Sequence, residues 1–415
     1  MSIHQHISGI IESIQQHNGI TLTSYLYNSF HNSKQLWTNH SNNNIIHNIH
    51  QLKLQLEQQC GAVSAPLNNV LVYHLIASHI HGTQYNIQLI QQYCYEAAEY
   101  LFTYIEQEKD IIWCLPAINV LCIQLRYYSQ LHSTSSLMAT QELLRSYLQR
   151  MIVDRSDIKS SKKLGCIMII NQLFKIYFFI NNLRLCTNLI NLVKNLPSLD
   201  YYPISHQVTY QFYLGRLCVF EENYNKAELC LTFAFNNCHI DYTHNKQQIL
   251  HFLIPIKLLH GQYPTPQLLE QYNLQTQFQK LIHSLINGDI SIFISELNNN
   301  RQLYIKMGIY LLVEKLRYLL YRNIIRRIYI IHSKQLLTDI TSEYSTPPHQ
   351  LPLQLLLCGV HISSPDTTMT FNELECIIAN LIHYGYIRGY IAHKRFVVLS
   401  KTMPFPLIST IDTPT

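Results

Sequence analysis

The chain has 415 residues, of which 47% are hydrophobic and only 13% are charged. This composition excludes a disordered chain and a coiled coil, because both need a much larger share of charged residues. The length exceeds that of one ordinary domain, about 100 to 200 residues, but a helical solenoid can extend over it as one continuous body.

The net charge of +5 is unevenly distributed. Between Arg301 and Met403 there are twelve Lys and Arg residues and six Asp and Glu residues, so this quarter has a surplus of six positive charges. The rest of the chain is close to neutral. Such a basic C-terminal quarter indicates a polyanionic partner, either a nucleic acid or an acidic protein.

No targeting or membrane segment is expected. The N-terminus lacks a basic stretch followed by an apolar run, so it does not resemble a signal peptide. The most apolar stretch, Cys166 to Leu185, is interrupted by Asn, Gln, Lys and Arg, which predicts a buried helix pair in a soluble protein. The eleven cysteines form no C-x-x-C pair, so we expect buried, reduced thiols of an intracellular protein and no zinc site.

Apolar residues recur at helical spacing from about Leu67 onward. Short polar breaks separate the helical stretches, at His132 to Ser136, Arg155 to Lys163 and Asn195 to Pro203. Helices of two to four turns joined by tight links predict an α-solenoid of helical hairpins.

One hairpin can be predicted residue by residue, with "EENYN" (221–225) as its turn. Small residues before and after this turn allow two helices to approach closely, and a large residue fills the groove between them, as in a tetratricopeptide-type hairpin. The residues with this spacing are Leu214, Gly215, Ala227, Leu231 and Ala234.

A helix is predicted after Pro264, followed by two more helices joined by an Asn-Gly-Asp turn at 287–289. The next segment, Tyr304 to Lys334, is predicted to be helical and largely buried. If this helix is continuous over its middle, three cations seven and four positions apart share one face. These are Lys315, Arg322 and Arg326. The alternative is that they form only the solvated stripe of a buried helix.

The pattern changes after a proline-rich link, Ser342 to Pro352. A short helix (353–359) and a polar loop (363–368) precede a second helix, which begins with a capping box of Thr370 and Glu373 and ends at Gly385. Leu374, Ile377, Ile378, Leu381 and Ile382 form its apolar face.

A basic hairpin follows this helix, and the order helix, helix, two-stranded wing is that of a winged-helix domain. In its first strand Ile387 and Ile391 are expected to face the helices. Tyr386, Arg388 and Tyr390 are expected to point outward, and His393, Lys394 and Arg395 to occupy the turn. Interleaved aromatic and cationic groups suit phosphate contact and base stacking.

The helix before the wing is expected to expose Glu373 and Glu375 and no cation, which argues against reading duplex sequence through that helix. Nucleic-acid binding is therefore predicted to run through the wing, with help from the basic helix. The predicted contact residues are Arg388, Tyr390, His393, Lys394, Arg395, Lys401, Arg322, Arg326 and Arg327.

A helical solenoid that ends in a winged helix is the PCI architecture of the proteasome lid, the COP9 signalosome and a translation initiation factor. Five blocks in order (215–238, 245–265, 312–329, 373–401 and 404–410) resemble the PCI domain-containing protein 2 family, also described as COP9 signalosome subunit 12-like. The blocks in order, among them "ELECIIANLIHYGYIRGYIAHKRFVVLSK", are far more specific than any one motif. The resemblance covers about half of the chain, from Tyr210 to Thr410, and none is evident in the first 150 residues.

The resemblance implies a subunit of the nuclear transcription-and-export complex TREX-2. In that complex it would pair with a Sac-family scaffold and a small acidic Dss-type protein and assist messenger RNA export. The family's nucleic-acid platform would fall on Arg388, Lys394, Arg395 and Lys401. The link around Pro347 and Pro348 looks longer than is usual in the family.

Four parts are predicted: a divergent helical solenoid (1–200), the helical-repeat part of the PCI domain (201–345), its winged helix (346–405) and a tail (406–415). No phosphate-binding glycine motif is present, and histidine pairs such as His4/His6 and His79/His81 lack further metal ligands at suitable spacing. We therefore expect no catalysis and no cofactor. The expected location is the nucleus, in association with the nuclear pore, with some protein in the cytoplasm.

A second hypothesis shares the PCI fold but not the nucleic acid. In it the chain is a purely protein-binding subunit of a signalosome-like or lid-like assembly, and the same cations contact an acidic partner.

Overall fold

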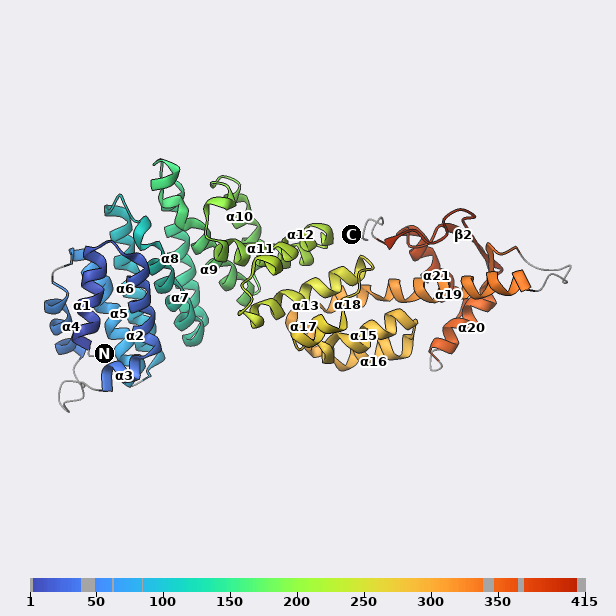
Figure 1. Cartoon of the computed structure of the whole chain (residues 1–415), viewed down its shortest axis with the longest axis horizontal. Coiled ribbons are helices and arrows are strands. Elements are labelled where there is room, and N and C mark those ends of the chain that lie inside the picture. Colours follow the sequence, from blue (N-terminus) through green and yellow to red (C-terminus); the bar gives the residue numbers. More distant parts are fainter. Residues whose placement is uncertain are drawn as a thin grey trace. The chain divides into compact units, whose positions relative to one another are not determined.

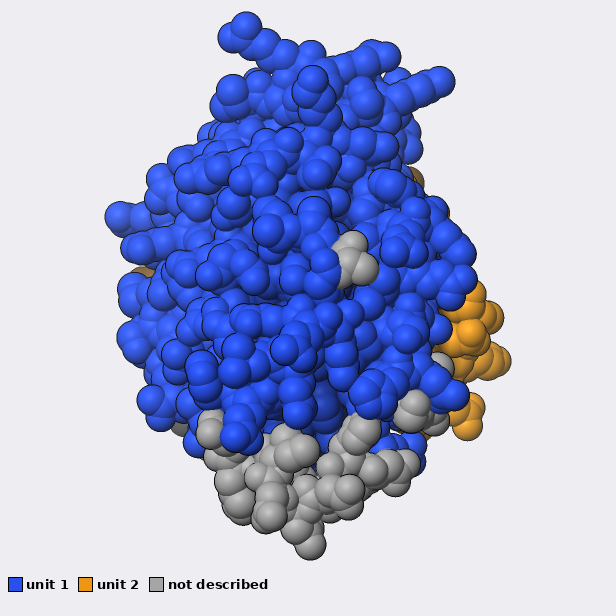
Figure 2. Space-filling view, turned by 90° about the vertical axis from the view of Figure 1, so that its left-hand side faces the viewer, with its two compact units in different colours: residues 1–210 blue, residues 211–415 orange. Residues whose placement is uncertain are grey.

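The computed structural model describes residues 3–38, 49–61, 63–83, 85–338, 347–364 and 369–408. It is built almost entirely of helices, with one small sheet near the C-terminus (Figure 1). The chain divides into two compact units, residues 1–210 and 211–415, which Figure 2 colours separately. Each unit is described by itself.

The first unit consists of helices that pack on their neighbours along the chain. Its elements are α1 (Ile3–Gln15), α2 (Gly19–His31), α3 (Ser33–Thr38), α4 (Ile49–Gln59), α5 (Ala65–Thr83), α6 (Ile87–Gln107), η1 (Ile112–Cys114), α7 (Leu115–His132), α8 (Thr134–Ile152), η2 (Ile158–Ser160), η3 (Lys162–Gly165), α9 (Cys166–Phe179), α10 (Leu183–Val193) and η4 (Leu199–Tyr201). Helices thus begin well before Leu67, where the apolar pattern becomes recognisable in the sequence.

Helix α5 explains part of that difference. It packs against α2, α3, α4 and α6, and every residue from Val70 to Ile80 is buried. A helix buried on all sides has no polar face, so its periodicity is weak although its apolar content is high.

The second unit begins within α11 (Ile204–Phe220) and continues with further helices. They are α12 (Tyr224–Asn237), α13 (Thr243–Leu259), α14 (Pro266–Gln271), α15 (Gln275–Asn287), α16 (Ile290–Asn299), α17 (Arg301–Met307), α18 (Tyr310–Lys315) and α19 (Arg317–Thr338). The Asn-Gly-Asp turn between α15 and α16 is confirmed, with Gly288 in the left-handed region at φ +68°.

The hairpin of α11 and α12 packs as the small residues predict. Ala227, Leu231 and Ala234 are fully buried. A Cβ atom added to Gly215 would lie 2.6 Å from Cγ of Leu231, so only glycine leaves room for this helix contact.

The helix predicted over Tyr304 to Lys334 is not continuous. Helix α17 ends at Met307, where the following Gly308 adopts the left-handed region with φ +78°. Helix α18 then ends at Lys315, and α19 starts at Arg317. Lys315 therefore belongs to a different helix from Arg322 and Arg326, and the expectation of one shared cationic face is wrong.

The winged helix comprises β1 (Gln350–Pro352), α20 (Leu353–Ser363), α21 (Phe371–His383), β2 (Gly389–Ala392) and β3 (Phe396–Leu399). Its sheet is antiparallel in the order β1-β3-β2, so a third strand joins the predicted hairpin. The capping box of Thr370 and Glu373 is confirmed, and Gly385, at φ +78°, follows the end of α21.

These elements confirm a mainly helical solenoid that ends in a winged helix. The predicted bounds of the four parts, at residues 200, 345 and 405, stay predictions. Residues 342–346 of the predicted link, 365–368 of the polar loop and 409–415 of the tail lie outside the described residues.

Candidate nucleic-acid interface

The solvent-facing side of the wing carries an exposed tyrosine and an arginine. Tyr390 in β2 pairs with Val398 in β3 and is 64% exposed, whereas Val397 and Leu399 on the opposite side are buried. The backbone N–H of Ser400 donates to the Arg388 carbonyl at 2.8 Å, two positions before Tyr390. This hydrogen bond continues the pairing with β3 one residue beyond β2, to Arg388 but no further, so exposed Arg388 lies on the same side as Tyr390.

The tip of the wing holds three adjacent basic side chains. His393, Lys394 and Arg395 are exposed in a tight turn, which the Arg395 N–H closes on the Ala392 carbonyl at 3.0 Å. Lys394 has φ +59°, a left-handed conformation that is uncommon for a residue with a side chain. Lys401, just beyond β3, is also exposed.

A carboxylate on α21 holds this turn in place. Glu375 accepts a hydrogen bond from the backbone N–H of Lys394 at 2.6 Å, and its second oxygen lies 2.8 Å from Nδ1 of His393. The Lys394 N–H, with the His393 contact, lowers the pKa of Glu375.

The Glu375 side chain is only 13% exposed, so the expectation that it is displayed to solvent is wrong. This contact could not be predicted from the local sequence, because the partners of Glu375 lie 18 and 19 residues further along the chain.

Tyr386 does not point outward as predicted. It is 1% exposed, and so is Ile387 beside it. Strand β2 begins only at Gly389, so the alternation of a strand does not apply to residues 386 and 387, and both turn inward. The ring of Tyr386 lies parallel to that of Tyr318 in α19, with ring centroids 6.4 Å apart, so it joins the winged helix to the helical repeats.

Arg322 is also buried, with 5% exposure. Its Nε donates to the Tyr386 carbonyl at 3.3 Å and its NH2 group donates to the Pro406 carbonyl at 2.7 Å. Burial lowers the pKa of this guanidinium. A guanidinium enclosed in this way has no path to a phosphate, so Arg322 is left out of the interface proposed below.

The carbonyl of Pro406 belongs to a segment that we call the C-terminal strap, residues 404–408. At its start, the Pro404 carbonyl accepts a hydrogen bond from the Arg388 N–H at 2.9 Å. Its end places Ile408 against Gly261, where an added Cβ atom would lie 2.9 Å from Cδ1 of Ile408. Arg322 thus stabilises the strap between the wing and the helical repeats.

The other two predicted cations of α19 are exposed. Arg327 donates from NH1 to the carbonyl of Asn287, at the end of α15, and so lies on the helical part of the unit. Arg326 is the remaining exposed cation of the predicted stripe. The structure therefore gathers Arg388, Tyr390, His393, Lys394, Arg395 and Lys401 on the wing, and it places Arg326 and Arg327 on α19.

The described residues contain no group of three or more His, Cys, Asp and Glu side chains that could hold a metal ion. None of the helices in the described ranges combines the length and apolar composition that a membrane crossing requires. Nine of the eleven cysteines are buried, but Cys358 and Cys376 are exposed, contrary to the expectation of burial.

Comparison with known proteins identifies this architecture. The PCI domain matches residues 297–401. A PCI domain-containing protein 2 homolog from Drosophila melanogaster is 31% identical over 98% of this chain and 99% of its own length. One from Dictyostelium discoideum is 38% identical over 65% of this chain and 59% of its own length.

A relative from Neurospora crassa named Protein CSN12 homolog is 35% identical over 61% of this chain and 57% of its own length. The Drosophila match extends into the first 150 residues, where the sequence alone shows no evident resemblance. The chain therefore belongs to the PCI domain-containing protein 2 family.

Proposed function

We propose that this PCI protein is a non-enzymatic scaffold subunit of a TREX-2-like nuclear complex that contacts RNA or DNA through its wing. In this role it binds a Sac-family scaffold and a small acidic Dss-type protein and assists messenger RNA export. The family supports a subunit of a multiprotein assembly. The finer assignment depends on the chemistry of the wing.

The observation that carries the proposal is the side-by-side placement of Arg388 and Tyr390 on the open side of the sheet. A tyrosine ring that is 64% exposed can stack on a base, and adjacent cations can neutralise phosphates. Lys394, Arg395 and Lys401 extend the positive charge to both ends of β3.

Single strands suit this surface better than duplex grooves. Helix α21 carries no Lys or Arg between Phe371 and His383, so it lacks the side chains that commonly read guanine in a major groove. Stacking on Tyr390 requires an unpaired base, which a single-stranded RNA offers. We therefore propose binding with little sequence preference.

The absence of an enzymatic role is part of the proposal. Burial raises the pKa of the thiols of Cys94 and Cys122 to about 12, which leaves them protonated and unreactive at neutral pH. The exposed side of the wing offers cations and the Tyr390 ring, which bind anions and bases but supply no nucleophile with an adjacent general base. Turnover that a single point change abolishes would contradict this part.

The test measures the affinity of the full chain for a fluorescein-labelled 20-residue polyuridine as the salt concentration rises. The variant Arg388→Glu/Lys394→Glu/Arg395→Glu is expected to bind far more weakly, and its log-log salt slope should be shallower by about 0.7 for each phosphate that the protein no longer neutralises. Lys306→Glu, which changes an exposed cation of α17 outside the predicted contact residues, serves as the control and should leave the affinity unchanged. Unchanged affinity of the triple variant, measured on folded protein, would remove the wing from the mechanism.

The second function is a protein-binding subunit of a signalosome-like or lid-like assembly without nucleic acid. Glu375 favours it, because this carboxylate offsets part of the positive charge at the wing tip. Purification of the tagged protein from its own cells, with and without nuclease, separates the two. A Sac-type scaffold, a small acidic protein and messenger RNA support the first function, and signalosome or lid subunits without RNA support the second.

A further inference from the structure

A pocket of about 390 Å³ lies within the second unit, on the other side of α21 from the wing. Ile377 and Asn380 of α21 line it, two and five positions after Glu375, which faces the wing tip. At about 100° per residue both positions fall on the far side of the helix. The wing and this pocket are therefore separate surfaces of the winged helix.

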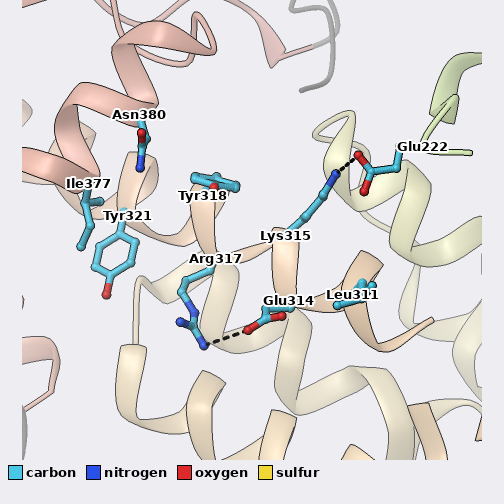
Figure 3. Close-up of a pocket in the computed structure, with 9 residues that line it drawn as sticks. All are labelled: Glu222, Leu311, Glu314, Lys315, Arg317, Tyr318, Tyr321, Ile377 and Asn380. Carbon is cyan, nitrogen blue, oxygen red and sulfur yellow. Dashed lines mark ion pairs between the residues drawn. The ribbon is translucent and has the colours of Figure 1, made fainter. Parts of the chain in front are cut away.

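The opposite wall belongs to the helical repeats. Leu311 and Lys315 of α18 and Tyr318 of α19 line it (Figure 3). Leu311 is 68% exposed, and Tyr318 is half-buried. With Ile377 across the pocket, these side chains form an open apolar site of a size that suits one or two side chains of a bound segment.

The charges around the pocket cancel. Lys315 Nζ lies 2.7 Å from Glu222, and Arg317 lies 3.9 Å from Glu314. A pocket with two carboxylates and two cations does not attract a polyanion, so a nucleic acid is the less suitable occupant. A protein segment with an apolar anchor fits better.

Lys315 and Arg317 differ in how closely they are paired with acceptors. Lys315 is held by Glu222 and also lies over the Tyr224 ring, 5.3 Å from its centroid. The distance of 3.9 Å from Arg317 to Glu314 is too long for a hydrogen bond. Nε of Arg317 is shielded from solvent and has no hydrogen-bond partner in the described residues. The Arg317 side chain as a whole is 43% exposed, so a bound carboxylate would pair with its terminal NH groups rather than with the shielded Nε.

We propose that this pocket binds a segment of a partner protein that presents an apolar side chain beside a carboxylate. The apolar side chain lies against Leu311, Tyr318 and Ile377, and the carboxylate accepts hydrogen bonds from Arg317. The inference rests on the proposed scaffold role and gives that role a second docking surface, independent of the wing.

The experiment selects a phage-displayed library of random 12-residue peptides on the full chain and on its variants. Wild-type protein is expected to enrich peptides with a large apolar residue near Asp or Glu. The affinity of a synthetic copy, measured by fluorescence polarisation, should fall about tenfold or more in Arg317→Glu and in Ile377→Asp. Arg317→Gln, which only removes the charge, keeps the test valid if the reversal impairs folding.

Selection on Arg317→Glu should enrich Lys or Arg in place of the acid, a reversal that a purely structural role of Arg317 would not produce. The control Arg326→Glu changes an exposed cation of the same helix and should leave the affinity for the peptide unchanged. Enrichment of no peptide, of peptides without a carboxylate, or competition by polyuridine for the same site would each overturn the proposal. The triple wing variant should bind the peptide normally, so failure of the wing and failure of the pocket are distinguishable.

Discussion

Two groups of arginines in the C-terminal quarter carry the same charge and have opposite environments. Arg322 is 5% exposed and donates to two backbone carbonyls, whereas Arg388 and Arg395 on the wing are exposed. The buried guanidinium is used to build the unit, and the exposed ones are available to a partner. A local surplus of positive charge therefore indicates a binding surface only after the buried cations have been separated from the exposed ones.

Removal of the buried charge is expected to have the largest effect on stability. Arg322→Leu leaves the carbonyls of Tyr386 and Pro406 without donors, and we expect a loss of about 2 to 4 kcal/mol in the free energy of unfolding. Denaturant unfolding of the full chain, followed by circular dichroism, measures it. The matched control is Arg326→Leu, an exposed position four residues later, for which a change within about 0.5 kcal/mol is expected. Equal losses in both variants would contradict the structural role of Arg322.

A change of volume without charge gives the next largest effect. Ala227 is fully buried in the α11–α12 hairpin, so Ala227→Leu should overpack it and cost about 1 to 3 kcal/mol. Ala227→Gly changes the same position without adding volume and serves as the control for helix propensity, at about 1 kcal/mol. The same unfolding measurement decides. If Ala227→Leu were as stable as wild type, the hairpin would have room for a larger side chain, and the close packing of α11 on α12 at Gly215 would be contradicted.

The turn at the tip of the wing should show a smaller, pH-dependent effect. The pKa of Glu375 is lowered in the folded protein, so its contribution is present above the unfolded value, about 4.3, and is lost as the pH falls below it. Amide hydrogen exchange at Lys394 should accelerate in that acid range, after correction for the intrinsic rate. In Glu375→Ala, which removes the acceptor, the exchange should already be fast at pH 7 and lack this dependence; an unchanged rate would refute the contact.

The smallest effect on stability is expected on the wing surface itself. The triple variant Arg388→Glu/Lys394→Glu/Arg395→Glu should unfold within about 0.5 kcal/mol of wild type for each exposed position. The urea midpoint measures this directly. A large loss would mean that these cations, like Arg322, support the fold, and the distinction between buried and exposed arginines would fail.

Much of the fold could be predicted because its signals are local. The spacing of Gly215, Ala227 and Leu231 fixes a hairpin within 17 residues, and the capping box of Thr370 and Glu373 fixes the start of α21 within four. Strand β1 could not be predicted, since its three residues become a strand only by pairing with β3, more than 40 residues later. The break between α18 and α19 is hidden for a similar reason, because both sides carry good helix formers.

The candidate site was less predictable than the fold. The positions of Lys394 and Arg395 in an exposed turn followed from the hairpin pattern. Arg322 is buried with the strap, which it contacts across 84 residues of sequence, and the Tyr386 ring packs against Tyr318 of α19. Arg317 and the pocket it lines depend in the same way on α21, which is distant in sequence. Contacts between residues so far apart in the chain produce no periodic pattern in the sequence from which they could be predicted.

The C-terminal strap has a mechanical consequence. It is bound to Arg388 at one end, to Arg322 in its middle and against Gly261 near its other end. A force applied to the wing is therefore passed not only into the sheet but also along this segment, to α19 and to the turn after α13. The wing and the helical repeats of the second unit then yield together under tension rather than hinging apart.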